Sequence, residues 1–341
     1  MAYQDRAGGS RAVADDVVTK APERRDAPPS EDRVGRSLPE FAALLAVLVV
    51  LVIFFSLQSD YFLRSSNLLN ILTAISVTGI IAVPGTMLLI SGQFDLSVGS
   101  GAAFCGVVLA TVGTDHGITM GVLVALLAGL IVGVVNGALV SVVGVNALIT
   151  TLGMLAVLRG FTQLLAGGQT ALFPGFTLLG TSRFLGVPVP VVIFAVIVVA
   201  GALVMRYTVY GRSLYATGAN PAAARLVGIR GRWSVFTGFV LSGVAVALAG
   251  LILTSQLSAA SPVAATGLEL SVIAAIVLGG ASLSGGRGTV MGTVLGLVLI
   301  GVLNNGLTLM NVSSFWQDVA RGSLLILAVS FDQIRQRFSA S

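Results

Sequence analysis

Residues 210–233 read YGRSLYATGANPAAARLVGIRGRW and form the longest polar segment after residue 37. The segment separates two long apolar runs, Val187–Met205 and Val235–Leu257, and it contains several arginines but no acidic residue. Within it, Asn220 is a residue type that caps helix N-termini, and Pro221 suits the first helical position. We therefore predict a short, capped helix on a basic connection between two apolar segments.

The predicted helix continues through Leu226 and ends near Gly228, because glycine adopts the left-handed conformation without strain. A capped helix on a basic connection suits contact with a partner protein, and an amphipathic loop resting on lipid headgroups is the alternative. The candidate contact residues are Asn220, Pro221, Ala222, Ala223, Ala224, Arg225, Leu226, Val227, Gly228 and Ile229.

The apolar residues outside this segment occur in long runs. Of the 341 residues, 55% are hydrophobic and 10% are charged, whereas soluble domains contain about 25% charged residues. The runs suit helices that cross a bilayer, and they do not alternate as barrel strands do. Glycines recur at four-residue intervals, which lets helices approach closely in lipid. We predict an all-α polytopic membrane protein, with small-residue helix faces at Gly129, Gly133 and Gly137 and at Gly292 and Gly296.

About ten apolar segments can be counted at roughly 20 residues for each crossing. With residues 1–37 as a disordered cytoplasmic leader, this count returns the tail, residues 333–341, to the cytoplasm. It also places most arginines on the cytoplasmic side, in agreement with the positive-inside rule. We predict a transmembrane domain over residues 38–332, both termini in the cytoplasm, and a cytoplasmic segment over residues 206–234. The predicted spans are Phe41–Leu57, Leu68–Ser91, Leu96–Val112, Ile118–Val143, Ala147–Ala166, Val187–Met205, Val235–Leu257, Leu268–Leu283, Thr289–Met310 and Phe315–Val329.

Two pairs of similar stretches indicate an internal repeat. DLSVGSGAAF begins at Asp95 and ELSVIAAIVL at Glu269, while GLIVGVVNG begins at Gly129 and GLVLIGVLNNG at Gly296. The copies are an odd number of predicted spans apart, which reverses their orientation in the membrane. We predict an inverted repeat, with a pathway where the two copies meet. Chance similarity between stretches rich in glycine, valine and leucine is the alternative.

Several functional classes require residues that this sequence does not provide. The single lysine, Lys20, follows Thr19, whereas a phosphate-binding loop needs its lysine directly after a glycine. The single cysteine and the single histidine, Cys105 and His116, stand apart from any cluster with metal-ligand spacing. The cations lie at span ends, which is not the footprint of a nucleic-acid-binding face. We therefore expect no metal, no cofactor and no enzymatic site in this chain.

Four motifs in a fixed order resemble those of a known family. They are SGQFDLSVGS at 91–100, GANPAAARLVGI at 218–229, VLGGASLSGGRGTVMGTVLG at 277–296 and GVLNNGL at 301–307. Over roughly residues 40–330, the chain resembles the membrane permease subunits of ribose-type bacterial ABC importers. It departs from the family pattern at Gln93-Phe94, where the family usually has Gly-Ile.

The resemblance implies a permease that forms the path for a sugar such as ribose, xylose or a related monosaccharide. It also implies a homodimer in the bacterial inner membrane, a separate cytoplasmic ATPase that uses ATP and magnesium, and an extracytoplasmic sugar-binding protein. Residues 220–229 would dock on the ATPase, and loops 167–186 and 258–267 would face the binding protein. Alternative substrates are nucleosides, signalling furanones and amino acids. An ion-coupled secondary transporter and a channel or scaffold are alternative mechanisms.

Several polar residues lie within or beside the apolar segments. Asp95 and Glu269 each precede a Leu-Ser-Val sequence, so they can stabilise the start of a helix or can line a path. Asn136, Asn304 and Asn305 can join neighbouring helices by hydrogen bonds or can bind a sugar hydroxyl. The sequence leaves both interpretations open for all five residues.

Overall fold

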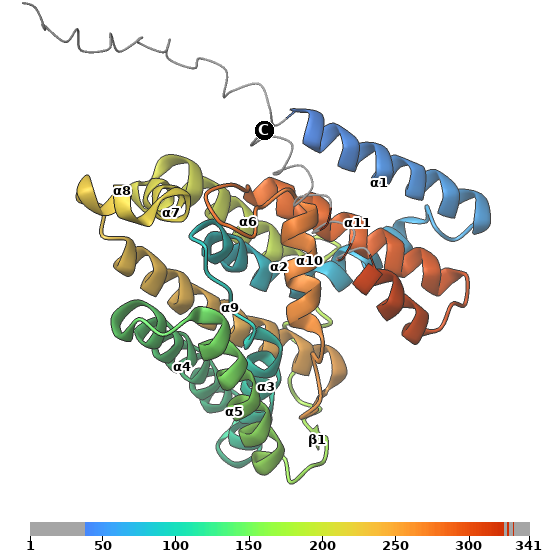
Figure 1. The fold of residues 1–341 in the computed structure, drawn as a ribbon. Coiled ribbons are helices and arrows are strands. Elements are labelled where there is room, and N and C mark those ends of the chain that lie inside the picture. The colour runs from blue at the N-terminus through green and yellow to red at the C-terminus, as the bar shows by residue number, and fades with distance from the viewer. Residues whose placement is uncertain (1–37, 324–325, 327–329, 331–341) are drawn as a thin grey trace, which may run out of the picture. The chain divides into compact units, whose positions relative to one another are not determined.

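The computed structural model describes residues 38–323, 326 and 330, which are mostly helical (Figure 1). The predicted leader, residues 1–37, and tail, residues 333–341, lie outside the described residues. Residues 314–323 form a further helix after α11. The preceding helices are α1 Leu38–Gln58, α2 Ser65–Ile90, α3 Val98–His116, α4 Ile118–Gly137, the π-helical η1 Ala138–Val143, α5 Ala147–Leu165, α6 Val189–Tyr207, α7 Val209–Ala219, α8 Pro221–Leu226, α9 Gly231–Leu257, α10 Leu268–Leu278 and α11 Val290–Leu309.

Among the described residues, seven helices are long and apolar enough to cross a membrane, and two shorter apolar helices, Ala42–Gln58 and Leu268–Leu278, accompany them. This content confirms the predicted class, an all-α polytopic membrane protein. The last predicted span, Phe315–Val329, lies partly outside the described residues. The seven long helices are Ser65–Ile90, Val98–His116, Ile118–Val143, Ala147–Leu165, Val189–Tyr207, Gly231–Leu257 and Val290–Leu309.

The predicted span Leu268–Leu283 is too long. Helix α10 ends at Leu278, and the connection to α11 contains glycines in the left-handed region, among them Gly280 and Gly285. A helix cannot continue through such residues, so the glycine-rich sequence ends α10 early. The result is a helix of 11 residues, about 16 Å long at 1.5 Å per residue and too short to cross a bilayer core.

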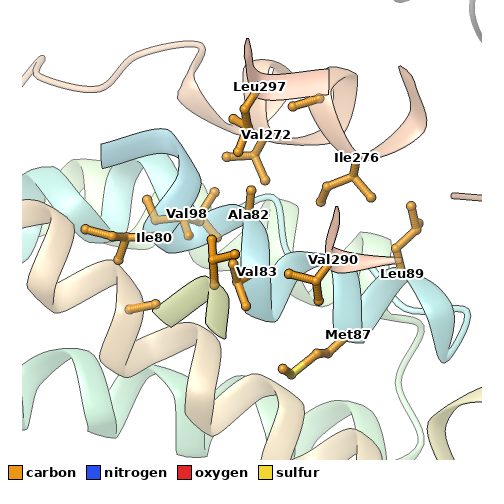
Figure 2. Packing of buried hydrophobic residues seen from close by; sticks show 14 of the residues in the cluster. Ile80, Ala82, Val83, Met87, Leu89, Val98, Val272, Ile276, Val290 and Leu297 are labelled. Carbon is orange, nitrogen blue, oxygen red and sulfur yellow. The ribbon is translucent and has the colours of Figure 1, made fainter. Parts of the chain in front are cut away.

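Helices α2 and α9 are the centre of the packing. Helix α9 packs most extensively against α4 and α3, and α2 packs against α6, α9, α10 and α11. The core between them consists of buried aliphatic side chains. Figure 2 shows Val83 of α2 and Val98 of α3 in one cluster with Val272 of α10 and Val290 of α11. Two pairs of consecutive helices, which are distant from each other in the sequence, thus share one apolar core.

The predicted glycine faces lie at the closest helix contacts. A Cβ added at Gly133 of α4 would collide with α9, because it would lie 3.0 Å from the Cα atom of Val240. A Cβ added at Gly129 would lie 2.6 Å from the carbonyl oxygen of Gly243. On α11, Gly292 and Gly296 lie in the same way against the backbone of α10. Only glycine permits these separations, so the stripes fix how α4 and α11 pack.

Helices α3 and α10 both begin in the interior of the domain. The side chain of Asp95, just before α3, accepts a hydrogen bond from Ser242, a residue near the middle of α9. Ser271, in the first turn of α10, lines the same pocket as Thr78, which lies midway along α2. The first turns of α3 and α10 also meet, because the Glu269 carboxylate lies against Gly99. Broken helices that start inside a bundle are typical of transporters.

Four two-residue strands lie at the ends of the long helices. Strand β1 Ala171–Leu172 pairs antiparallel with β4 Ala259–Ala260, and β2 Arg183–Phe184 forms a hairpin with β3 Val187–Pro188. The β1–β4 ladder joins the connection before α6 to the connection before α10. Loops 167–186 and 258–267, which are distant in the sequence, therefore lie side by side.

Candidate functional site

The predicted helix in the basic connection is present as α8, Pro221–Leu226. The Asn220 side chain caps it by accepting hydrogen bonds from the amides of Ala222, at 3.1 Å, and Ala223, at 3.0 Å. Gly228 follows in the left-handed region with φ 81°. Of the remaining candidate residues, Ala224 is buried, whereas Leu226 is 89% exposed and Val227 is 76% exposed. Two adjacent apolar side chains in solvent suggest a surface that a partner covers.

Helix α7, which precedes α8, was not predicted as a separate helix. Thr208 caps it, since the Thr208 hydroxyl accepts a hydrogen bond from the Gly211 amide at 3.2 Å. A threonine in a polar stretch is only a weak signal for the start of a helix, and it was the only local signal for α7. Helix α7 is stabilised by tertiary contacts, which the local sequence does not reveal.

Helix α7 contacts the ends of three other elements. The Tyr215 hydroxyl donates to the carbonyl of Gly288, before α11, at 2.8 Å. Burial raises the pKa of Tyr215 above its ordinary value, so this hydroxyl keeps its proton and remains a donor. The Ser213 and Ser234 hydroxyls share a hydrogen bond of 2.7 Å, which joins α7 to the start of α9. Gly218 lies against the carbonyl of Ile90, the last residue of α2.

A groove of about 850 Å³ lies beside this segment. Its lining includes Gln93 and Phe94, the two residues that depart from the family pattern, together with Ala224, Arg225 and Trp233. The departure therefore lies next to the capped helix, at the connection between α2 and α3. The polypeptide that leads to Asp95 and the segment that carries α8 share one surface.

Asp95 is the centre of a hydrogen-bond network that joins three elements. Its Oδ1 atom accepts from the Ser97 amide at 3.0 Å and from the Ser97 hydroxyl at 2.6 Å. Its Oδ2 atom accepts from the Ser242 hydroxyl of α9 at 2.8 Å. Asn136 of α4 extends the network, because its amide nitrogen donates to the Ser97 hydroxyl oxygen at 3.0 Å. Asp95 and Asn136, which the sequence placed in different segments, are thus brought together.

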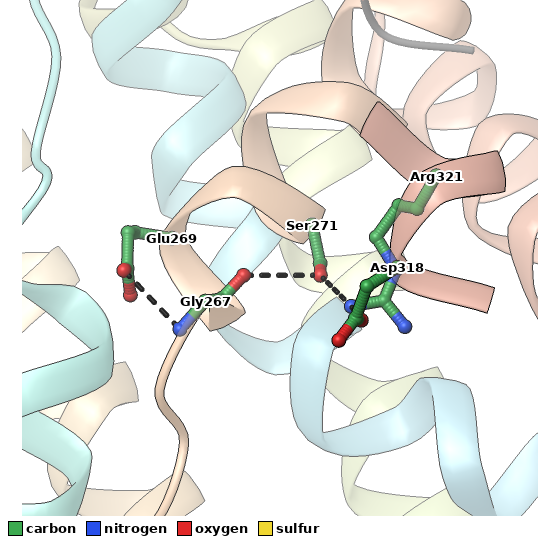
Figure 3. Close-up of polar contacts among 5 residues, drawn as sticks. All are labelled: Gly267, Glu269, Ser271, Asp318 and Arg321. Atoms are coloured by element: carbon green, nitrogen blue, oxygen red, sulfur yellow. Dashed lines mark hydrogen bonds and ion pairs between the residues drawn. The ribbon is translucent and has the colours of Figure 1, made fainter. Parts of the chain in front are cut away.

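Glu269 lies in the first turn of α10, where its Oε1 atom accepts from the Gly267 amide at 3.3 Å. Figure 3 shows the polar contacts that connect this turn to the helix of residues 314–323. The Ser271 hydroxyl donates to the Gly267 carbonyl at 3.2 Å, and Arg321 Nη1 donates to the Ser271 oxygen at 3.1 Å. Arg321 Nη1 also lies 3.5 Å from Asp318 Oδ1. Arg321 therefore ties the start of α10 to the last described helix.

The three asparagines have different surroundings. Asn305 exchanges two side-chain hydrogen bonds with Asn67 of α2, at 2.8 and 2.9 Å. This reciprocal pair joins α11 to α2, as Asn136 joins α4 to Ser97. Within the described part of the chain, the buried Oδ1 atom of Asn304 has no hydrogen-bond partner. Adjacent residues of the same type thus have different environments, which the sequence alone could not predict.

The comparison with known proteins agrees with this architecture. The family model described as "Branched-chain amino acid transport system / permease component" matches residues 67–329. The chain is 40% identical over 307 residues to the ribose import permease protein RbsC of Escherichia coli (strain K12), covering 88% of this chain and 95% of that protein. It is 40% identical over 293 residues to RbsC of Bacillus subtilis (strain 168), covering 84% and 90%.

Arabinose permeases are also similar. The chain is 37% identical over 314 residues to the L-arabinose transport system permease protein AraH of Escherichia coli (strain K12), covering 91% of this chain and 95% of that protein. No solved structure matches the chain. The long apolar helices and these relatives make it a multi-pass protein of the bacterial inner membrane. From the match over most of its length, the chain belongs to the family of ribose-type permease subunits of ABC transporters.

Proposed function

We propose that this chain forms the membrane path for a monosaccharide such as ribose, xylose or arabinose. The support for a sugar is the similarity to permeases named for ribose and L-arabinose, at 40% and 37% identity. A second copy of the chain completes the path, and a separate extracytoplasmic protein delivers the sugar. ATP and magnesium bind to a separate ATPase, in keeping with a chain whose single lysine is Lys20.

We propose about ten crossings with both termini in the cytoplasm. The seven long helices, α1 and the helix that starts at residue 314 support nine crossings, and the short α10 together with the connection before it supplies the tenth as a broken span. In this orientation α7, α8 and the α10–α11 connection face the cytoplasm, and the β1–β4 ladder faces outward. The resulting placement of Arg206, Arg212, Arg225 and Arg287 inside agrees with the positive-inside rule.

The packing supports an inverted repeat in which α2, α3 and α4 correspond to α9, α10 and α11. Helix α9 packs on α3 and α4, which follow α2 in the sequence, and α2 packs on α10 and α11, which follow α9. Each central helix therefore contacts the two helices that follow the other one. Asp95 and Glu269 occupy corresponding places before the two Leu-Ser-Val sequences. Their helices begin in the interior and meet through Glu269 and Gly99. In such folds, movement of one repeat against the other opens the path to alternate sides.

The docking surface for the ATPase is the capped helix α8, with residues 220–229 as its contact segment. The observation that carries this proposal is the attachment of α7 to α2, α9 and the α10–α11 connection. A force applied to α8 passes through α7 to the cytoplasmic ends of the helices that form the core. The exposed Leu226 and Val227 supply an apolar contact for the groove of a partner.

The test is co-purification of the ATPase with the permease from membranes that contain the complete transporter. Leu226→Asp places a charge at the proposed contact and should abolish co-purification while the permease level stays normal. Leu185→Asp is the matched control, because Leu185 is also 89% exposed but lies at the β2–β3 turn. Retention of the ATPase by the Leu226→Asp variant would show that α8 is not the docking helix.

The sugar is tested by reconstituting the permease, its ATPase and its binding protein into liposomes. Uptake of D-ribose or L-arabinose that depends on ATP is expected. A nucleoside and a branched-chain amino acid belong in the same panel, because the matching family description names branched-chain amino acids. Uptake driven by an ion gradient through this chain alone would contradict the proposal.

A further inference from the structure

A second pocket, distinct from the groove beside α8, lies between α2, the start of α10, α11 and the last described helix. Its volume is about 440 Å³, within the range of about 300–1,000 Å³ typical of small-molecule sites. It begins near the middle of α2 at Thr78 and extends toward the N-terminal part of that helix at Asn70. The polar side chains that line it are Asn70, Thr78, Thr266, Ser271, Asn304, Asn305, Thr308 and Arg321.

Two buried polar atoms on this lining have no hydrogen-bond partner among the described residues. One is the Asn304 Oδ1 atom on α11, and the other is the Arg321 Nε atom on the last described helix. An unpaired buried polar atom costs about 1–3 kcal/mol. Asn304 and Arg321 both line the pocket, and each retains unused hydrogen-bonding capacity, an acceptor on Asn304 and a donor on Arg321. Such a lining suits a ligand that both donates and accepts hydrogen bonds.

The charges around the pocket restrict the ligand further. Arg321 is the one charged side chain among the described residues that line it, and Arg321 already lies 3.5 Å from Asp318. A cation would meet an unfavourable charge, whereas a neutral ligand needs no counter-charge. Several aliphatic side chains complete the lining, among them Ile75, Leu297 and Ile300. A neutral sugar fits this lining, because its hydroxyl groups can bond to the polar side chains and its C–H groups can pack on the aliphatic ones.

We propose that this pocket holds a monosaccharide during its passage through the permease, with the side chains of Asn304 and Arg321 binding its hydroxyl groups. This inference rests on the proposed function and identifies a place on the path. Asn305 has a different role in the same pocket, because its amide is already engaged by Asn67. Asn304 therefore binds the ligand, whereas the adjacent Asn305 joins α11 to α2.

The first test replaces each asparagine by leucine, which has a similar size and no polar atoms, and measures D-ribose uptake in the reconstituted transporter. Asn304→Leu should raise the KM for uptake by about tenfold, because one hydrogen bond to the sugar is lost. The thermal stability of this variant should be equal to or above that of the wild-type permease, because leucine removes an unpaired buried polar atom. Asn305→Leu should instead lower the thermal stability, because the Asn67 amide loses its partner.

The second test uses chemical labelling. Cys105, the single cysteine, is fully buried, so a cysteine introduced at an accessible position reacts selectively with a membrane-impermeant thiol reagent. D-ribose at millimolar concentration should slow the labelling of Thr266→Cys, at the exposed edge of the pocket, and L-leucine should not. Thr181→Cys is the matched control, because Thr181 is exposed but lies outside the pocket lining.

The possible failures can be told apart. If the wild-type complex takes up neither D-ribose nor L-arabinose, the sugar assignment fails, and the pocket proposal fails with it. If the wild-type complex transports the sugar and Asn304→Leu transports it with an unchanged KM, only the pocket proposal is overturned. The same conclusion follows if D-ribose slows the labelling of Thr266→Cys and Thr181→Cys equally.

Discussion

At the scale of single residues, the buried polar groups divide into those that hold helices together and those left open. Asp95 accepts three hydrogen bonds from Ser97 and Ser242. These bonds keep the connection before α3 attached to the middle of α9. A carboxylate with three donors is already engaged, so its contacts are those expected of a structural residue.

Asp95→Leu should therefore reduce the amount of folded permease. Leucine cannot accept hydrogen bonds, so the Ser97 and Ser242 hydroxyls lose their acceptor, at about 1–3 kcal/mol for an unsatisfied buried group. The measurement is the melting temperature of the purified protein and its level in the membrane. Asp115→Leu is the control, because Asp115 is exposed near the end of α3. Normal amounts of the Asp95→Leu protein without transport would instead place this carboxylate on the path.

At the scale of elements, local signals predicted some helices well. Helix α8 could be predicted because its cap is encoded by the adjacent Asn220 and Pro221, and the long spans because continuous apolar sequence is sufficient for a crossing. Helix α7 could not be foreseen in the same way, because it depends on contacts with Ile90 and Gly288. The glycines after α10 indicated a broken span, but they did not show that the helix ends at Leu278.

The site was less predictable than the fold. Asp95, Asn136, Glu269, Asn304 and Asn305 were recognisable as unusual polar residues in apolar surroundings. The partners of Asp95 and Asn305 could not be identified, because Ser242 and Asn67 come from helices far away in the sequence. The distinction between Asn304 and Asn305 arises from a rotation of about 100° between adjacent helix positions, and that rotation has meaning only once the neighbouring helices are placed.

The glycine contact between α4 and α9 gives a prediction at this scale. Gly133→Ala should lower the free energy of unfolding by about 1–3 kcal/mol, because the added methyl group overpacks a backbone contact. A thermal unfolding measurement in detergent tests this. Gly153→Ala is the matched control, since a Cβ at Gly153 of α5 would meet nothing within 4 Å. Equal stability of the two variants would refute the close approach of α4 and α9.

At the scale of the whole molecule, α2, α7 and the α10–α11 connection meet one another. The Gly286 amide donates to the Ile90 carbonyl at 2.8 Å, which joins the α10–α11 connection to the end of α2. Gly218 of α7 lies against both, and a Cβ there would be 2.6 Å from the Gly286 nitrogen. The proposed coupling segment, α2 and the α10–α11 connection therefore meet at a single backbone junction.

Gly218→Ala should separate docking from transport. The added methyl group displaces α7 from α2, so uptake should fall by about tenfold or more, while α8 and its exposed side chains remain available to the ATPase. Sugar uptake and ATPase co-purification, measured on the same preparation, test this. Gly160→Ala serves as the control, because a Cβ at Gly160 would have open space around it. Unimpaired uptake by the Gly218→Ala transporter would exclude this junction as a route for force.

The β1–β4 ladder has a consequence for engineering this permease. Ala171 pairs with Ala260 and Leu172 with Ala259, and the Phe173 amide donates to the Ser258 carbonyl at 2.8 Å. A chimaera that takes only one of the loops 167–186 and 258–267 from a homologue would have to pair β1 and β4 strands from two different proteins. Grafts that change either loop should therefore exchange both segments together.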